Sequence, residues 1–298
     1  MQITSIPIDL RGMETTQHGS PDFPIAVYRS ILSRNTLGFI DWHWHVELQF
    51  CLVTEGAVLF SVSGAQYRLA SGDGIFVNSG YLHMARPLDR ESAYLCVDAH
   101  PALLSFFPDS RMDKRYVEPW LHNAALTLMP LYSSVEWQQE ILTAVSELER
   151  LNTETAFGFE YAVCTVLASM WLSLLRHSGA EPKQGKLQQN AAAQRILLYL
   201  HSHFREDIRL EDIAREVSFS RNECCRLFKS VTGETIFSHL QRCRLEHALR
   251  LLRQSELSIS DIAAECGFGS VSHFIALFRR ELGTTPLQYR KTHCRERS

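Results

Sequence analysis

Three histidines in the N-terminal half are spaced so that their imidazoles could meet at one site. His43 and His45 are separated by one residue, three residues separate His45 from Gln49, and His83 comes further along the chain. Imidazole nitrogens bind transition metals, and they also donate or accept hydrogen bonds. This group of side chains therefore indicates either a metal site or a pocket for a small polar ligand.

The histidines lie within two segments that resemble the two sequence motifs of the cupin family. The first is WHWHVELQ at residues 42–49, followed by Gly56, and the second is GDGIFVNSGYLH at residues 72–83. The resemblance implies a small β-barrel in which two histidines, a carboxylate and a third histidine meet at one end. Gln49 stands in place of the carboxylate, and Asn78 replaces a proline. Because a neutral amide binds a divalent cation more weakly than a carboxylate does, we expect weak metal affinity here.

We therefore favour hydrogen bonding and packing at a ligand pocket over metal binding by His43, His45 and His83, and we assign no catalytic residue and no cofactor. By strand alternation, Glu47 points to the same side as these histidines and adds an acid to the pocket. The candidate effector-binding residues are His43, His45, Glu47, Gln49, His83, Trp42 and Trp44. Sugars, sugar acids, aromatic acids and amines all remain possible effectors.

A second pattern is an internal duplication in the last hundred residues. Residues 208–219 (IRLEDIAREVSF) match residues 257–268 (LSISDIAAECGF) at an offset of 49. Each copy predicts a short helix, a turn and a second helix, with Ser220 or Ser270 as the N-cap of that second helix. A long arginine-rich amphipathic helix is expected between the copies, over residues 235–255. Two such units at a fixed separation suit consecutive major grooves of DNA, about 34 Å apart.

The second copy carries a specific family resemblance. ISDIAAECGF at residues 259–268, FRR at 278–280, GTTP at 283–286 and the pair Tyr289 and Arg290 resemble the signature of the AraC/XylS family of bacterial transcription regulators. The resemblance covers residues 191–291. It implies two helix-turn-helix units that both bind DNA and, usually, activation of transcription near a promoter.

The outward positions of each second helix are the candidate DNA contacts. On the first, Arg226 and Asn222 suit guanine and adenine edges, whereas Arg221 and Lys229 suit phosphates. On the second, Val271 or Ala276 suits thymine methyls, His273 suits base edges, and the two arginines suit phosphates; longer polar side chains are common there in the family. The full set is Arg221, Asn222, Cys225, Arg226, Lys229, Ser270, Val271, His273, Ala276, Arg279 and Arg280.

The elements that must position these residues define an α+β multidomain protein. Short alternating runs separated by glycine turns predict a β-barrel, with strands expected at residues 25–32, 47–54, 57–63, 66–70, 74–77 and 93–97. Helical spacing then predicts a hairpin of helices at residues 135–151 and 155–177. We divide the chain into an effector-sensing, cupin-like barrel (1–132), a hairpin that mediates dimerisation (133–177), a linker (178–190) and an all-α DNA-binding domain (191–298).

Composition sets limits on the function. Residues 191–298 hold 17 Lys and Arg against 13 Asp and Glu, whereas the rest of the chain holds 13 against 20, so the basic part is the expected polyanion-binding part. The apolar stretches are too short to span a bilayer, and no signal peptide is evident, so we expect a cytoplasmic protein without a membrane partner. The eight cysteines include no C-x-x-C pair, which indicates neither a zinc site nor a disulfide framework.

These patterns together predict a sequence-specific DNA-binding regulator that is not an enzyme. We expect a ligand-responsive activator whose partners are double-stranded promoter DNA, a small-molecule effector, RNA polymerase and a second copy of the chain. One alternative is a metal-dependent cupin enzyme fused to a DNA-binding module. The other is a repressor, or a ligand-independent regulator, in which the barrel serves assembly.

Overall fold

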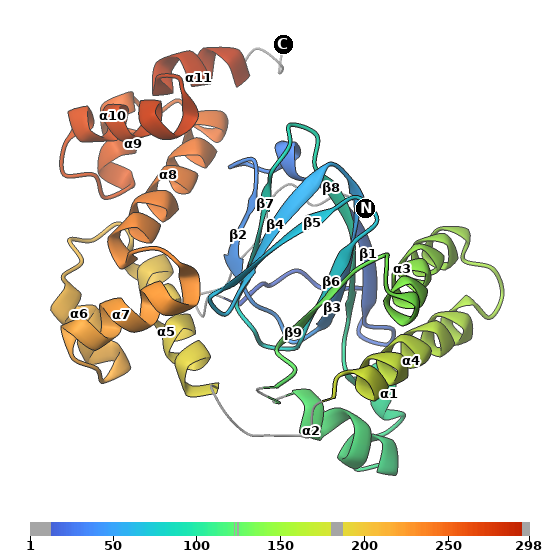
Figure 1. The fold of residues 1–298 in the computed structure, drawn as a ribbon. Helices are drawn as coiled ribbons and strands as arrows, with labels where there is room; N and C mark the ends of the chain where they lie inside the picture. The colour runs from blue at the N-terminus through green and yellow to red at the C-terminus, as the bar shows by residue number, and fades with distance from the viewer. Residues whose placement is uncertain (1–12, 122, 124, 180–186, 294–298) are drawn as a thin grey trace. The chain divides into compact units, whose positions relative to one another are not determined.

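The computed structural model describes residues 13–121, 123, 125–179 and 187–293, and the chain divides into two compact units, residues 1–191 and 192–298 (Figure 1). The first unit holds every β-strand of the described residues, with two long helices beside the sheets. The second unit is helical throughout its described part.

Two antiparallel sheets form the barrel of the first unit. The five-stranded sheet has the order β1-β8-β3-β6-β9, and the four-stranded sheet has the order β2-β7-β4-β5. The strands are β1 (Ile25–Ile31), β2 (Ile40–His43), β3 (Leu48–Glu55), β4 (Ala57–Val62), β5 (Ala65–Ala70), β6 (Gly74–Val77), β7 (His83–Pro87), β8 (Ala93–Ala99) and β9 (Leu128–Leu131). Alternate apolar side chains of both sheets, including Phe60, Ile75 and Val77, fill the space between them.

The six strands expected from the sequence are all present, to within two residues at their ends. Three further strands, β2, β7 and β9, were not predicted. They are four or five residues long, and β7 contains an arginine and a proline, so neither alternation nor β-propensity marks them. The two that were missed on the smaller sheet carry His43 and His83.

The predicted helical hairpin is formed by α3 (Glu136–Glu154) and α4 (Phe159–His177). Residues of α3 and α4 such as Leu142, Val145 and Leu167 are buried against one face of the larger sheet, beside Phe50 and Phe76. Short segments precede the hairpin: a 3-10 turn (Leu32–Arg34), α1 (Ala102–Ser105), a π-helical turn (Asp113–Val117) and α2 (Glu118–Leu121). Among the described helices, α4 alone is long and apolar enough by composition to cross a membrane, but its core-facing residues belong to this apolar cluster.

The expected linker is shorter than the sequence suggested. Helix α5 (Leu187–His203) begins inside residues 178–190, because the run of Gln and Asn after Leu187 is compatible with a helix. Residues 180–186 of the linker lie outside the described residues.

The second unit contains two helix-turn-helix pairs joined by one long helix, as the duplication predicted. The helices are α6 (Leu210–Val217), α7 (Arg221–Thr232), α8 (Ile236–Gln254), α9 (Ile259–Glu265), α10 (Val271–Leu282) and α11 (Pro286–His293). Both predicted N-caps are formed: the Ser220 hydroxyl accepts a hydrogen bond from Glu223 N, and the Ser270 hydroxyl accepts one from His273 N. Phe228 of α7 and Phe278 of α10 are fully buried on the inner faces of these helices.

The two turns have the same hydrogen bonds but different residues at one left-handed position. Phe219 N donates to Ala214 O in the first turn, and Phe268 N donates to Ala263 O in the second. Ser218 has φ of 60° and Gly267 has φ of 75°. A Cβ on Gly267 would lie only 2.7 Å from two backbone oxygens of residues 204 and 205, so glycine is required there.

Candidate ligand-binding and DNA-binding sites

His43 and His83 form a cross-strand pair inside the barrel. They are direct partners in the pairing of β2 with β7, and their ring centroids are 4.1 Å apart. His43 Nδ1 donates to the Asp41 carbonyl at 2.8 Å, and His83 Nδ1 donates to the Tyr81 carbonyl at 2.9 Å. Because a carbonyl can only accept, the proton of each ring is on Nδ1, and each Nε2 presents a lone pair.

The larger sheet brings a glutamine and an acid to the same place. Gln49 on β3 and Asp98 on β8 are cross-strand partners, and the Gln49 amide donates to Asp98 Oδ1 at 3.1 Å. His45, just before β3, is 3.4 Å from the Gln49 amide nitrogen through its Nε2. The sequence placed Gln49 in the pocket, but Asp98 was missed because every residue of β8 is buried and no alternation distinguishes the acid.

Two more polar residues reach the site from the segment before the first strand. A parallel bridge between Met13 and Trp44 places Glu14 with one carboxylate oxygen 3.7 Å from His43 Nε2 and the other 3.7 Å from His18 Nε2. His18 Nδ1 lies 3.6 Å from Asp98 Oδ2. We call Glu14, His18, His43, His45, His83 and Asp98 the His-acid cluster.

Burial keeps the His-acid cluster mostly uncharged near neutral pH. Burial raises the pKa of Glu14 to about 8, with a contribution from the nearby Asp98 carboxylate, and raises the pKa of Asp98 to about 7. Burial also lowers the pKa of His18 and His83 to about 4 and holds the pKa of His43 and His45 well below the usual value. The imidazoles are therefore neutral and able to accept hydrogen bonds or bind a metal.

Several buried polar atoms of this cluster lack a hydrogen-bond partner among the described residues: Glu14 Oε1, His18 Nε2, His45 Nδ1 and His83 Nε2. Leaving such an atom unsatisfied costs about 1–3 kcal/mol. A bound polar molecule would satisfy these atoms. The ring nitrogens of His43, His45 and His83 also lie within 4.8 Å of one another, so a cation could bind them, with a carboxylate supplied by Glu14 rather than by position 49.

The other predicted pocket residues differ in burial and in their distance from the His-acid cluster. The Glu47 carboxylate is 3.5 Å from His45 Nδ1, at the edge of the cluster. Trp42 is buried, and Trp44 is half-buried with its backbone carbonyl accepting from Glu14 N. Tyr28 was not predicted, although its hydroxyl is 3.2 Å from His18 Nδ1.

In the second unit, α7 displays the five predicted contact residues on its solvent side. Arg221, Asn222, Cys225, Arg226 and Lys229 are all exposed, while Cys224 and Phe228 face the core. Arg221 forms an ion pair with Glu211 of α6 at 2.6 Å, which fixes it across the turn. Within the described part of the chain, no hydrogen bond or ion pair holds the Arg226 guanidinium, so it is available to a ligand.

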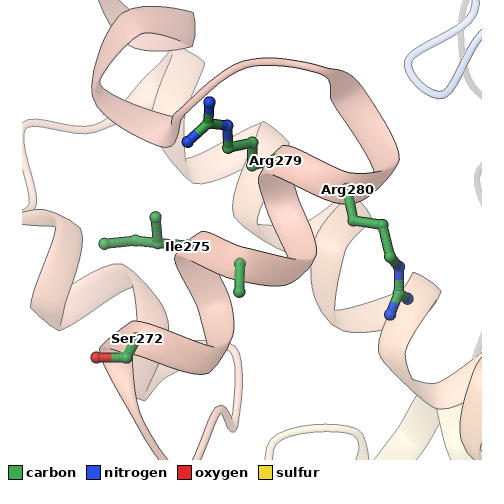
Figure 2. Close-up of a pocket in the computed structure, with 5 residues that line it drawn as sticks. Ser272, Ile275, Arg279 and Arg280 are labelled. Atoms are coloured by element: carbon green, nitrogen blue, oxygen red, sulfur yellow. The ribbon is translucent and has the colours of Figure 1, made fainter.

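The outward face of α10 is less polar. Ser270, His273, Ala276, Arg279 and Arg280 are exposed, and Val271 is half-buried. A surface hollow of about 610 Å³ lies on this face, and Figure 2 shows side chains that line it. Its lining consists of Ser272, Ile275, Ala276, Arg279 and Arg280. Ser272 and Ile275 were not predicted, although the helical period that selects Ala276 and Arg279 also selects them.

Comparisons with known proteins agree with both units. Residues 24–131 match the family model of the AraC-like ligand binding domain, and residues 213–292 match a helix-turn-helix domain model. The DNA-binding domain of AdpA, solved in complex with a target DNA, is 31% identical and covers 36% of this chain and 96% of its own, with a TM-score of 0.34.

Full-length relatives extend the match over nearly the whole chain. An uncharacterised HTH-type transcriptional regulator of Bacillus subtilis, YdeC, is 32% identical over 95% of this chain and 97% of its own length. The HTH-type transcriptional activator RhaS of Klebsiella pneumoniae is 28% identical over 84% of this chain and 87% of its own. The chain therefore belongs to the AraC family, as a DNA-binding transcription regulator that carries an AraC-like ligand-binding domain and is not an enzyme.

Proposed function

We propose that this regulator is a ligand-responsive activator whose effector binds at the His-acid cluster. The observation that carries the proposal is the set of buried polar atoms there that have no hydrogen-bond partner among the described residues. Because native proteins satisfy nearly all buried polar atoms, a group of orphans at one place indicates a site whose partner arrives from outside. The polar atoms of the cluster, including those of Glu14, His18 and Asp98, support this effector site; the aromatic residues around the cluster are not needed for the argument.

The geometry favours an effector that donates hydrogen bonds. The Nε2 lone pairs of His43 and His83 both point away from their backbone partners, and Glu14 Oε1 is a further unsatisfied acceptor. Hydroxyl groups of a sugar, or an ammonium group, match such acceptors, whereas the carboxylate of an aromatic acid has no hydrogen to donate to them. We therefore place sugars and amines ahead of acids among the candidate effectors.

Thermal unfolding followed by tryptophan fluorescence tests this site, because all five tryptophans lie before residue 191. A panel of sugars, amines and aromatic acids should contain a compound that raises the unfolding temperature of the wild type. His83→Gln should abolish that shift. His177→Gln, which changes an exposed histidine of α4, should preserve it. A shift that survives in His83→Gln would place the effector elsewhere.

For DNA, we propose that α7 reads bases and that α10 mainly holds the backbone. Arg226 and Asn222 are the candidate base-reading residues of α7, since Arg226 is exposed and its guanidinium makes no hydrogen bond or ion pair with the described residues. Arg279 and Arg280 line the hollow on α10 and are the candidate phosphate contacts; their guanidinium groups point in different directions (Figure 2), and Arg280 also forms an ion pair with Glu281 at 2.7 Å.

We further propose that a second copy of the chain covers the outer face of α4. The most apolar 18-residue window of this helix is only 28% buried. Tyr161 and Leu172, which are 85% and 42% exposed, lie on one stripe of the helix with Thr165 and Ala168 between them. A two-fold pair of such faces would bury the stripe isologously. Light scattering should show a dimer that Leu172→Asp weakens and that Glu140→Lys, on exposed α3 surface, leaves intact; a wild-type monomer would contradict the proposal.

Activation through RNA polymerase, in the cytoplasm, completes the proposed function. It is supported by the relative named as an activator. In vitro transcription from a promoter bound by the protein should increase when protein and effector are added together. A decrease would identify a repressor instead.

A further inference from the structure

A second group of metal-ligating side chains lies in the DNA-binding unit, away from both reading helices. His239 and Cys243 are one helical turn apart on α8, and His201 faces them from α5. The ligand atoms of these three residues lie within 4.8 Å of one another. His201 Nδ1 and Cys243 Sγ are 3.8 Å apart, close to the separation of a nitrogen and a sulfur that share a tetrahedral metal ion.

One histidine of this group is oriented as metal-binding histidines usually are. His239 is fully buried, and its Nδ1 lies 3.1 Å from Glu234 Oε1. Glu234 is itself held by Arg242, whose guanidinium donates to both carboxylate oxygens at 2.5 Å and lies 2.6 Å from His239 Nδ1. His239 Nε2 is buried without a hydrogen-bond partner among the described residues. A carboxylate on one ring nitrogen and an unsatisfied second nitrogen is the arrangement that fixes a ligand histidine.

The chemistry of the donors selects the type of ion. Two imidazoles and a thiolate suit Zn²⁺, which commonly takes three protein ligands and one water at sites with an open position. Cys243 would bind the ion as the thiolate, the form in which cysteine ligates metals. His201 is half-buried, which leaves a path for solvent to the fourth position.

We propose that His201, His239 and Cys243 form a Zn²⁺ site within the DNA-binding unit, with a solvent molecule as the fourth ligand. The ion would join α5 to α8, the helix that connects the two helix-turn-helix units. Its role is to stabilise this unit rather than to contact DNA, because none of its ligands lies on α7 or α10. Cysteine spacing gave no sign of such a site, since its ligands come from two helices and only one is a cysteine.

Cobalt titration of the full chain, after removal of metal with a chelator, tests the proposal directly. A thiolate bound to Co²⁺ absorbs in the near ultraviolet, and a site built from imidazoles and carboxylates does not. We expect this absorption in the wild type, with one equivalent of Zn²⁺ abolishing it. Cys243→Ser should eliminate it, and His201→Gln should weaken Co²⁺ binding by about tenfold or more, as losing an outer partner of a ligand already does.

Matched controls separate this site from the barrel. His203→Gln changes a half-exposed histidine on the same helix, and Cys164→Ser changes a half-buried cysteine of the other unit; both should keep the absorption. His83→Gln should also keep it, because His83 belongs to the His-acid cluster. Absence of the band in the wild type, or its persistence in Cys243→Ser, would overturn the proposal. If Cys243→Ser does not fold, an unchanged affinity in His201→Gln would overturn it equally.

Discussion

The two units of this regulator keep their polar side chains in opposite places. The ligand-binding unit buries histidines and carboxyl groups such as His83 and Asp98 between its sheets. Apart from the group around His239, the DNA-binding unit instead has an apolar core, and Arg226 and Arg279 lie on the outer faces of α7 and α10. A small molecule must be surrounded to be recognised, whereas a duplex is recognised across a surface. Where the unpaired polar groups lie therefore indicates which kind of ligand each unit receives.

The largest expected effect follows from the apolar core of the DNA-binding unit. Phe228→Ala should lower the free energy of unfolding of this unit by about 3–5 kcal/mol, because a fully buried aromatic side chain is lost and a cavity remains. Urea unfolding followed by circular dichroism measures it. The tryptophan-reported transition of the other unit should not move; a common shift of both transitions would show that the two units do not unfold separately.

The next effect tests the outer surface. Arg226→Ala should weaken binding to the cognate promoter by about 1–3 kcal/mol and relax the preference at one base pair, as loss of a bidentate base contact does. Arg279→Ala should weaken binding to cognate and random DNA alike and reduce the salt dependence by about one phosphate contact. Fluorescence anisotropy at several salt concentrations distinguishes these results. Equal losses on both DNAs for Arg226→Ala would remove the proposed division between α7 and α10.

A smaller effect concerns pH and the buried acids. A carboxyl group whose pKa is raised in the folded protein stabilises the fold fully when the pH is below its pKa in the unfolded chain. That contribution is lost as the pH rises through about 7 for Asp98 and about 8 for Glu14. The histidines with lowered pKa values affect the stability only below pH 6.5, where the stability falls as the pH drops toward about 4. Between pH 6.5 and 8 the ligand-binding unit should therefore lose about 1–2 kcal/mol. Urea unfolding by tryptophan fluorescence checks this loss, and Asp98→Asn should reduce it.

The smallest effect concerns a polar group with a purely structural task. Ser220→Ala should lower the stability of the DNA-binding unit by about 1 kcal/mol, because its hydroxyl caps α7 and shares a capping box with Glu223. Ser230→Ala, further along the same helix, removes an exposed hydroxyl that donates to the Leu227 carbonyl, and it should change stability by less than about 0.5 kcal/mol. Similar losses of stability in both variants would show that the Ser220 cap stabilises the unit no more than an ordinary exposed hydroxyl does.

The fold of the DNA-binding unit could largely be predicted from the sequence because its signals are local. Helix spacing, the caps at Ser220 and Ser270 and the duplicated turn all lie within a few residues of the features they specify. The outward side chains of α7 followed from which residues face inward. Besides Ser272 and Ile275 on α10, the metal-ligating group of α5 and α8 was missed, since it joins residues about forty positions apart.

The barrel pocket could be predicted only in part, for the same physical reason. His43, His45, Gln49 and His83 were found from their spacing, but the strands carrying two of them are too short to show a period. Glu14 and Asp98 reach the site through a parallel bridge and a buried strand, and both are contacts between distant segments. Local patterns in a single sequence do not show which distant segments pair.

The two turns of the helix-turn-helix units show what has become of an ancestral duplication. Ser218 and Gly267 occupy equivalent positions, yet only the glycine is pressed against the backbone at residues 204 and 205. Position 218 of the first copy can therefore accept glycine, the residue of the second copy. Position 267 of the second copy cannot accept serine unless the neighbouring backbone moves. The two copies are therefore not interchangeable at this turn.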